Sequence, residues 1–115
     1  MLPDCIFCKI VAGQMDGKIL YHDQEVTAFL DAHPVTPVHI LIVPNKHIPS
    51  LNQLEEGDVA LIGKMALIAR QIAREQGVGK SGYRLVINTG ADAGQSVLHL
   101  HLHLIAGQRL GSRPI

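Results

Sequence analysis

Residues 97–105 alternate between two kinds of side chain, and this alternation restricts the fold more than any other stretch does. A repeat of two is the period of a β-strand, so alternate side chains are expected on opposite faces of the chain. Neighbours on one face would lie about 6.6–6.8 Å apart. The pattern therefore predicts one strand with a buried leucine face and a row of imidazoles on the other face. The alternating positions are Val97, His99, His101, His103 and Ile105, with leucines at positions 98, 100, 102 and 104.

A row of imidazoles suits two kinds of chemistry. Neutral imidazole is a common metal ligand, and it is also a nucleophile and acid–base group near pH 7. A third interpretation is a strand that merely tolerates histidines on its wet face. That one is disfavoured, because the leucine at every intervening position buries one face and leaves the other for a specific role. The residues alone leave metal binding and catalysis both open.

The low charge content of the chain restricts its partners. Only 17% of the 115 residues are charged, 47% are apolar, and ten basic residues balance ten acidic ones. This balance predicts no binding to nucleic acid and none to an anionic membrane. The absence of a signal peptide and of a membrane-spanning run predicts a soluble, cytoplasmic protein. We expect one domain over residues 1–115, with apolar surface that a second copy covers in a homodimer.

A short helix is predicted over residues 4–13, where it carries a Cys-x-x-Cys pair. Asp4 is the expected N-cap, and Gly13 is expected to end the helix. Cys5 and Cys8 could form half of a zinc site, a redox pair or two inert thiols. The redox interpretation is disfavoured because the motif does not follow a strand. The other two interpretations stay open on spacing alone.

The remaining elements contain no repeated β-α-β unit. Their order is three strands, a long helix with an apolar stripe, and two further strands. This order predicts an α+β fold: a five-stranded antiparallel sheet with one long and one short helix. The predicted strands are residues 18–22, 26–31, 38–43 (stopped by Pro44) and 83–88 together with the histidine strand, and the predicted long helix is residues 58–76 with Leu61, Met65, Ile68 and Ile72 in its stripe.

Two loops carry further candidate binding groups. Asp31 lies where a strand meets a proline-rich loop, so it either caps a turn or accepts hydrogen bonds from a ribose diol. The glycine-rich turn at residues 89–95 leads directly into the histidines, and the N–H groups of such a turn can cradle a phosphate. His39, within an apolar strand, would ordinarily be a core histidine, and His47 lies on a loop.

Taken together, these motifs resemble the histidine triad family, whose signature is His-φ-His-φ-His-φ-φ with φ apolar. The resemblance covers nearly the whole chain and is closest to the nucleotide-binding branch, whose members are homodimeric nucleoside phosphoramidases. It implies a homodimer with a continuous sheet and a purine nucleotide or nucleoside phosphoramidate as substrate. The residues that carry the resemblance are 5–7, 29–31, His39, 44–48, 82–88 and 94–105.

The resemblance also implies roles for individual residues. His101 would attack the α-phosphorus of the substrate, and water would hydrolyse the resulting nucleotidyl-histidine. His103 and Ser96 would hydrogen-bond the phosphate and the departing group, while His39 would support His101. The implied nucleotide contacts are Asp31 with the ribose, Asn88, Gly94, Gln95 and Ser96 with the phosphate, and Ile6, Phe7, Ile10, Phe29 and Leu41 around the base.

Three features place the chain within the family. Branches that transfer nucleotides to a sugar phosphate carry Gln at the position of His103, so the histidine favours hydrolysis. Zinc-containing relatives bind the metal with residues that match Cys5, Cys8, His47 and His99, which implies a closed structural zinc site. The C-terminus lacks the tryptophan of eukaryotic members, which leaves the leaving group open. The alternatives are a dinucleoside polyphosphate hydrolase, as in the fragile-histidine branch, and a non-catalytic dimer that binds nucleotides or proteins.

Overall fold

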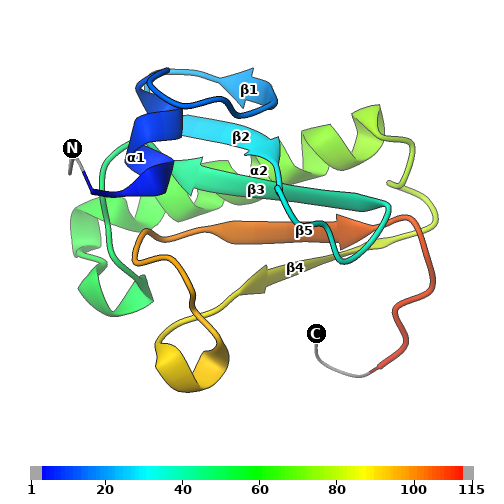
Figure 1. Cartoon of the computed structure of the whole chain (residues 1–115). Coiled ribbons are helices and arrows are strands. Elements are labelled where there is room, and N and C mark those ends of the chain that lie inside the picture. The colour runs from blue at the N-terminus through cyan, green and yellow to red at the C-terminus, as the bar shows by residue number, and fades with distance from the viewer. Residues whose placement is uncertain (1–3, 113–115) are drawn as a thin grey trace.

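The computed structural model of the chain describes residues 4–112. The elements follow one another in the predicted order, and the α+β fold with a five-stranded antiparallel sheet and one long helix is confirmed. Figure 1 shows the strands side by side with the helices outside them. The elements are α1 (Ile6–Val11), β1 (Ile19–His22), β2 (Val26–Leu30), β3 (Val38–Pro44), α2 (Val59–Glu75), β4 (Tyr83–Ile87) and β5 (Leu102–Ala106), with 3-10 turns at Leu51–Gln53, Glu56–Asp58 and Ala91–Ala93.

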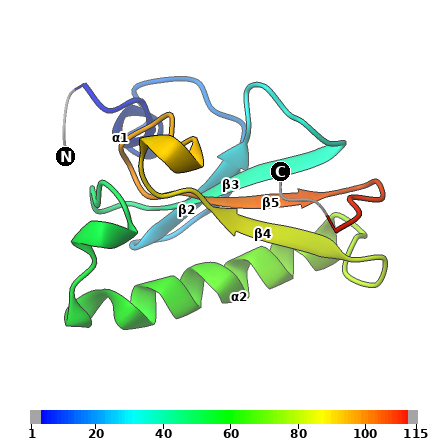
Figure 2. The same ribbon diagram turned by 90° about the horizontal axis from the view of Figure 1, so that it is seen from below.

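The sheet separates two layers of side chains. Among the described residues its strand order is β1-β2-β3-β5-β4, and every neighbouring pair is antiparallel. Figures 1 and 2 show α2 against one face and α1 on the opposite face. Alternation along β3 decides which side chains meet which helix: Ile40 and Ile42 pack in the cluster under α2, whereas Leu41 and Val43 pack with Phe7 of α1.

The long helix buries one stripe of its surface against the sheet. Leu61, Met65, Ile68 and Ile72 are all buried, as predicted from their spacing. Burying each such side chain stabilises the fold by roughly 1.5–3 kcal/mol. Gly77 follows the helix with φ +75°, the left-handed conformation that commonly ends helices. No helix within residues 4–112 is long and apolar enough to cross a membrane.

The histidine stretch is only partly a strand, which corrects the prediction of one continuous strand from residue 97. Strand β5 begins at Leu102, whose partner on β3 is Ile42. Two residues beyond Ile42, Pro44 has no N–H to donate, so the ladder cannot continue there. The preceding segment bonds to a loop instead, since the Leu100 amide donates to the Ile48 carbonyl at 2.7 Å.

The leucines of this stretch also fail to share one environment. Leu98 is 68% exposed, whereas Leu100 is 1% exposed and packs in the cluster under α2. The predicted leucine floor is therefore wrong at Leu98 and right from Leu100 onward. The histidines likewise divide between two sites.

The ends of β1, β2, β4 and α2 differ from the predicted ones by one residue, and two further boundaries change for a physical reason. The first helix spans Ile6–Val11, and its N-cap is Cys5 rather than Asp4, because the Cys5 sulfur accepts the Cys8 amide at 3.4 Å. Strand β3 was predicted to end before Pro44, but Pro44 is its last residue and pairs with Val26 of β2.

Candidate functional site

The register of three strands places the polar site residues on the sheet face opposite α2. Leu41 of β3 lies between Phe29 of β2 and His103 of β5. His39 is two residues earlier on β3, so its side chain points to the same face as that of Leu41. The Asp31 amide donates to the His39 carbonyl at 3.0 Å, which brings Asp31 beside His39 just past the end of β2.

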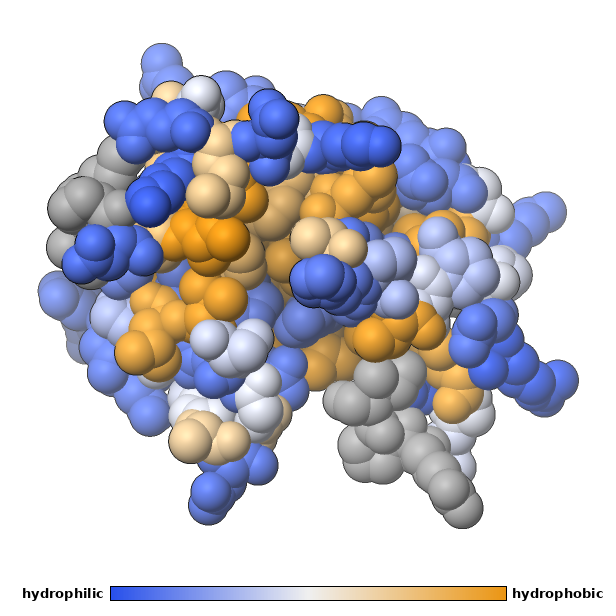
Figure 3. Space-filling model, viewed as in Figure 1, coloured by the Kyte–Doolittle hydropathy of each residue, from blue (hydrophilic) through white to orange (hydrophobic). Residues whose placement is uncertain are grey.

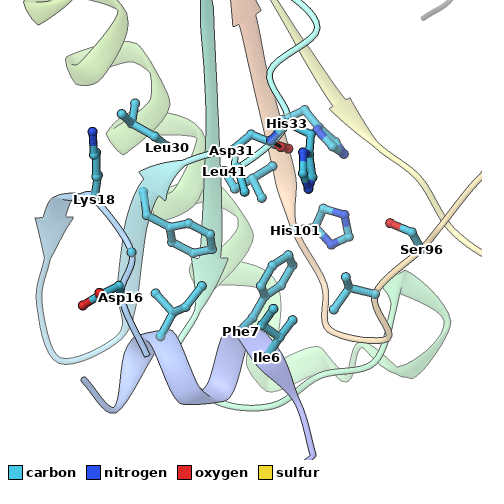
Figure 4. Close-up of a pocket in the computed structure, with 16 residues that line it drawn as sticks. Ile6, Phe7, Asp16, Lys18, Leu30, Asp31, His33, Leu41, Ser96 and His101 are labelled. Carbon is cyan, nitrogen blue, oxygen red and sulfur yellow. Dashed lines mark hydrogen bonds between the residues drawn. The ribbon is translucent and has the colours of Figure 1, made fainter. Parts of the chain in front are cut away.

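A pocket of about 790 Å³ opens on this face, within the range of about 300–1,000 Å³ that is usual for small-molecule sites. Figure 3 shows hydrophobic side chains gathered over the middle of the face with hydrophilic ones around them. In Figure 4, Ile6 and Phe7 rise from α1 on one side, Asp31 and Leu41 lie opposite, and His101 and Ser96 stand at one end. Predicted site residues that line it are Ile6, Phe7, Ile10, Phe29, Asp31, Leu41, Ser96, His101 and His103.

The hydrogen bond of His101 determines which of its ring nitrogens is free. Its Nδ1 lies 2.7 Å from the His99 carbonyl, which can only accept, so Nδ1 carries the proton. The Nε2 of the neutral ring therefore keeps an unprotonated lone pair. The Phe7 ring packs edge-on against the imidazole with centroids 5.1 Å apart and restricts its orientation. The His101 ring is thus held in a fixed orientation in the pocket wall, with Nε2 unbonded.

His39 lies behind His103 and does not line the pocket itself. The Nε2 of His39 is 2.9 Å from Nδ1 of His103 and 3.3 Å from Oδ2 of Asp31. Burial lowers the pKa of both rings, that of His103 to about 4, with positive charge on neighbouring histidines adding to the effect on His103. The nearby Asp31 carboxylate acts to raise the pKa of both rings, but the effect of burial is larger. Both imidazoles are therefore neutral at pH 7.

The glycine-rich turn braces the pocket wall rather than lining it. The Gln95 side chain accepts the Gly90 amide at 2.9 Å and donates to the carbonyl of Pro49 at 2.7 Å. The Asn88 side chain donates to the Ala93 carbonyl at 2.8 Å, and the Gly94 amide is bonded within the turn. These groups already have partners inside the protein, and phosphate binding by the turn stays a prediction.

A second cluster lies beside the pocket and contains Cys5, Cys8, His47 and His99, whose ligand atoms are within 4.8 Å of one another. The Nδ1 of His99 lies 3.3 Å from the Cys5 sulfur, 3.6 Å from the Cys8 sulfur and 3.2 Å from Nδ1 of His47. Tetrahedral zinc with ordinary bond lengths sets sulfur–nitrogen edges of about 3.6 Å and nitrogen–nitrogen edges of about 3.3 Å. The donor atoms fit a zinc ion in both type and spacing.

The positions of the ring protons in this cluster are also compatible with a bound metal. The Nε2 of His99 donates to the Pro44 carbonyl at 2.8 Å, so its Nδ1 is unprotonated and faces the cysteines, as is usual for metal-binding histidines. Burial lowers the pKa of His99 to about 4 and also lowers that of His47, so both are neutral. Burial raises the pKa of the Cys5 thiol. A bound cation would reverse that shift.

Asp31, His39 and His103 also lie within 4.8 Å of one another, but their protons do not fit a metal. The Val35 amide donates to Nδ1 of His39 at 3.1 Å. A neutral imidazole has one unprotonated nitrogen, and here that nitrogen is already occupied by the amide. Metal binding at Nε2 would therefore cost His39 a hydrogen bond or its last proton.

The pocket also contains residues that were not among the predicted site residues: Asp16, Gly17, Lys18, Leu30, Ala32, His33 and Val97. In Figure 4, Asp16 and Lys18 lie at the end far from His101. A Cβ atom at Gly17 would stand 2.8 Å from Cγ2 of Ile10, so glycine lets this loop close on α1. No periodic pattern marks the loop, and only the glycine could have signalled a close approach.

Comparison with known proteins agrees with this geometry. The family model described as HIT domain matches residues 12–110. The chain belongs to the HIT domain family. This HIT domain is 41% identical over 111 residues to the purine nucleoside phosphoramidase of Escherichia coli, with 96% of the chain and 93% of that relative covered.

Solved structures resemble this HIT domain closely. A HIT family hydrolase from Clostridium thermocellum superposes with a TM-score of 0.97 at 36% identity over 100% of both chains. A zinc-bound histidine triad family protein from Mycobacterium smegmatis superposes with a TM-score of 0.79 at 33% identity, covering 96% of this chain and 78% of that one. The family predicted from the histidine motif is confirmed.

Proposed function

We propose that this HIT domain is a hydrolase that cleaves purine nucleoside 5′-phosphoramidates, or related AMP-type conjugates, at the α-phosphate. The observation that carries the proposal is the free Nε2 of His101 in a pocket that is lined by apolar side chains and by the Asp31 carboxylate. The phosphoramidase name of the Escherichia coli relative supports the same substrate class.

The proposed reaction has two displacement steps. The His101 Nε2 forms a bond to the α-phosphorus while the phosphorus–nitrogen bond breaks, and the departing amine takes up a proton. Water then breaks the histidine–phosphorus bond, which releases the mononucleotide and restores His101. Ser96 and His103 would donate to the phosphoryl oxygens. Asp31 would accept from the ribose hydroxyls, with the base against the apolar wall formed by Ile6, Phe7, Ile10, Phe29 and Leu41.

We also propose a structural zinc ion bound by Cys5, Cys8, His47 and His99. Four protein ligands leave no open position for a substrate or an activated water. When bound, the metal would supply a fixed link between α1 and the segment that contains His101. The zinc-bound relative from Mycobacterium smegmatis supports this assignment.

A homodimer completes the proposal. Strand β4 forms one edge of the sheet, and an unpaired edge is a template for a second copy. Leu85 on β4 is 38% exposed, and Val59 and Leu67 on α2 are 72% and 56% exposed. Edge pairing of β4 with its symmetry mate would give a continuous sheet and cover such surface. A cytoplasmic location and a single domain over residues 1–115 stay predictions.

An adenosine 5′-phosphoramidate that carries a fluorescent amine tests the function. We expect release of the fluorophore by the wild-type protein and by His22→Gln, a control at an exposed histidine outside the pocket. His101→Gly is expected to abolish release while AMP affinity stays within about tenfold, or roughly 1.4 kcal/mol. Binding without release by the wild type would favour a non-catalytic binding module, and wild-type turnover by His101→Gly would exclude the mechanism.

A further inference from the structure

A chain of hydrogen bonds runs from a main-chain amide to the pocket wall. The Val35 amide lies 3.1 Å from Nδ1 of His39, and Nε2 of His39 lies 2.9 Å from Nδ1 of His103. His39 is only 6% exposed, so water does not compete for these contacts. An amide N–H can only donate, which makes Nδ1 of His39 an acceptor.

The acceptors on the other side of His39 require the same arrangement. Its single proton must sit on Nε2, which faces Nδ1 of His103 at 2.9 Å and the Asp31 carboxylate at 3.3 Å. His103 then accepts at Nδ1, so its own proton must sit on Nε2, its only other nitrogen. Because His103 lines the pocket, this N–H is the end of the chain that a substrate can meet.

The same chain resists protonation. A second proton on His39 would face the Val35 amide, and a second proton on His103 would face the N–H of His39. Either case sets two donors against each other and leaves one of them unpaired in a buried place, which costs free energy. The titratable or charged groups on the surrounding elements are Asp31 after β2, His33 in the following loop, His101 before β5 and Arg84 on β4, whose guanidinium donates to the Gly111 carbonyl.

We propose that Val35 is a positioning residue whose backbone amide, acting through His39, holds His103 as a neutral N–H donor to the substrate's phosphoryl group. This inference rests on the proposed function. It gives His103 one role, a fixed donor for the phosphoryl oxygens. It also excludes His103 as the acid that protonates the departing amine, because a ring held neutral has no spare proton to give. That proton must come from a different group or from solvent.

The ring nitrogens can be observed directly by ¹⁵N NMR, because their shifts report which nitrogen carries the proton. In the wild type at pH 7 we expect Nε2 protonated and Nδ1 unprotonated on both His39 and His103. Val35→Pro removes the amide proton, and Val35→Ala is the matched control that keeps it. The proline variant should raise the pKa of the His39–His103 pair by about one pH unit or reverse the tautomer. The alanine variant should leave the ring shifts in place.

If the proline variant fails to fold, a second pair of variants tests the same inference. His39→Gln can still accept from Val35 and donate to His103, whereas His39→Glu can only accept. The glutamine variant should keep the His103 proton on Nε2, whereas the glutamate variant should move it to Nδ1. We expect kcat of the glutamate variant to be at least about tenfold lower than that of the glutamine variant, with a smaller difference between their KM values. The inference would be overturned if His39 of the wild type carried its proton on Nδ1. It would also be overturned if the His103 proton stayed on the same nitrogen in both His39→Gln and His39→Glu. Absence of turnover in the wild type would instead reject the proposed function, since the ring shifts do not depend on activity.

Discussion

Replacing His103 by glutamine should make the stability of the protein less sensitive to acid. Burial lowers the pKa of His103 to about 4 in the folded protein, whereas an unfolded histidine titrates near about 6.5. Between these values the unfolded chain binds more protons than the folded one, so the free energy of unfolding rises with pH and is lost as pH falls. From pH 7 to pH 5 this one group should remove about 2 kcal/mol, at up to about 1.4 kcal/mol per pH unit.

Urea unfolding at fixed protein concentration, at pH 7, 6 and 5, measures the effect. His103→Gln should lose about 2 kcal/mol less than the wild type over this range, because glutamine has no titrating group and its amide oxygen can still accept from His39. Loss of metal from the cysteine cluster in acid would affect both proteins and cancels in the difference. His33→Gln, at an exposed histidine of the pocket rim, is the matched control and should follow the wild type. Equal slopes for His103→Gln and the wild type would refute the reasoning.

Three further predictions concern the metal, the ribose and the dimer. Protein purified without a histidine tag should contain about one zinc per chain by elemental analysis, and Cys8→Ser should lose it; metal-free wild-type protein of full stability would exclude the site. Asp31→Asn should weaken AMP binding in calorimetry by roughly 10–100-fold, since a hydrogen bond to a charged group contributes about 1.5–3 kcal/mol, and unchanged affinity would exclude the ribose contact. Sedimentation at micromolar concentration should show a dimer that Leu85→Lys weakens by charging the edge strand, and a monomeric wild type would contradict the β4 interface.

The order of elements could be predicted because it depends on local periods. The alternation of β3 and the 3.6-residue stripe of α2 are complete within each segment, so the sequence contains the signal. The grouping of Cys5 and Cys8 with His47 and His99 came from resemblance, because their contacts span 39–94 positions in the chain. The Asp16–Lys18 wall was missed, since its position depends on how the loop packs on α1. No side-chain pattern could have revealed the donor from Val35, because that donor is a backbone amide.

The start of β5 at Leu102, rather than at residue 97, is what gives His101 its free nitrogen. A strand between two neighbours uses its carbonyls in the ladder, and β5 lies between β3 and β4. If β5 began at residue 97, as the alternation suggests, the carbonyl of His99 would be bonded to a neighbouring strand. Because β5 begins at Leu102, that carbonyl instead accepts from Nδ1 of His101 at 2.7 Å. An extended chain alternates its side chains whether or not it is part of a ladder. The pattern of residues therefore stays the same, while the His99 carbonyl becomes available to orient the His101 ring.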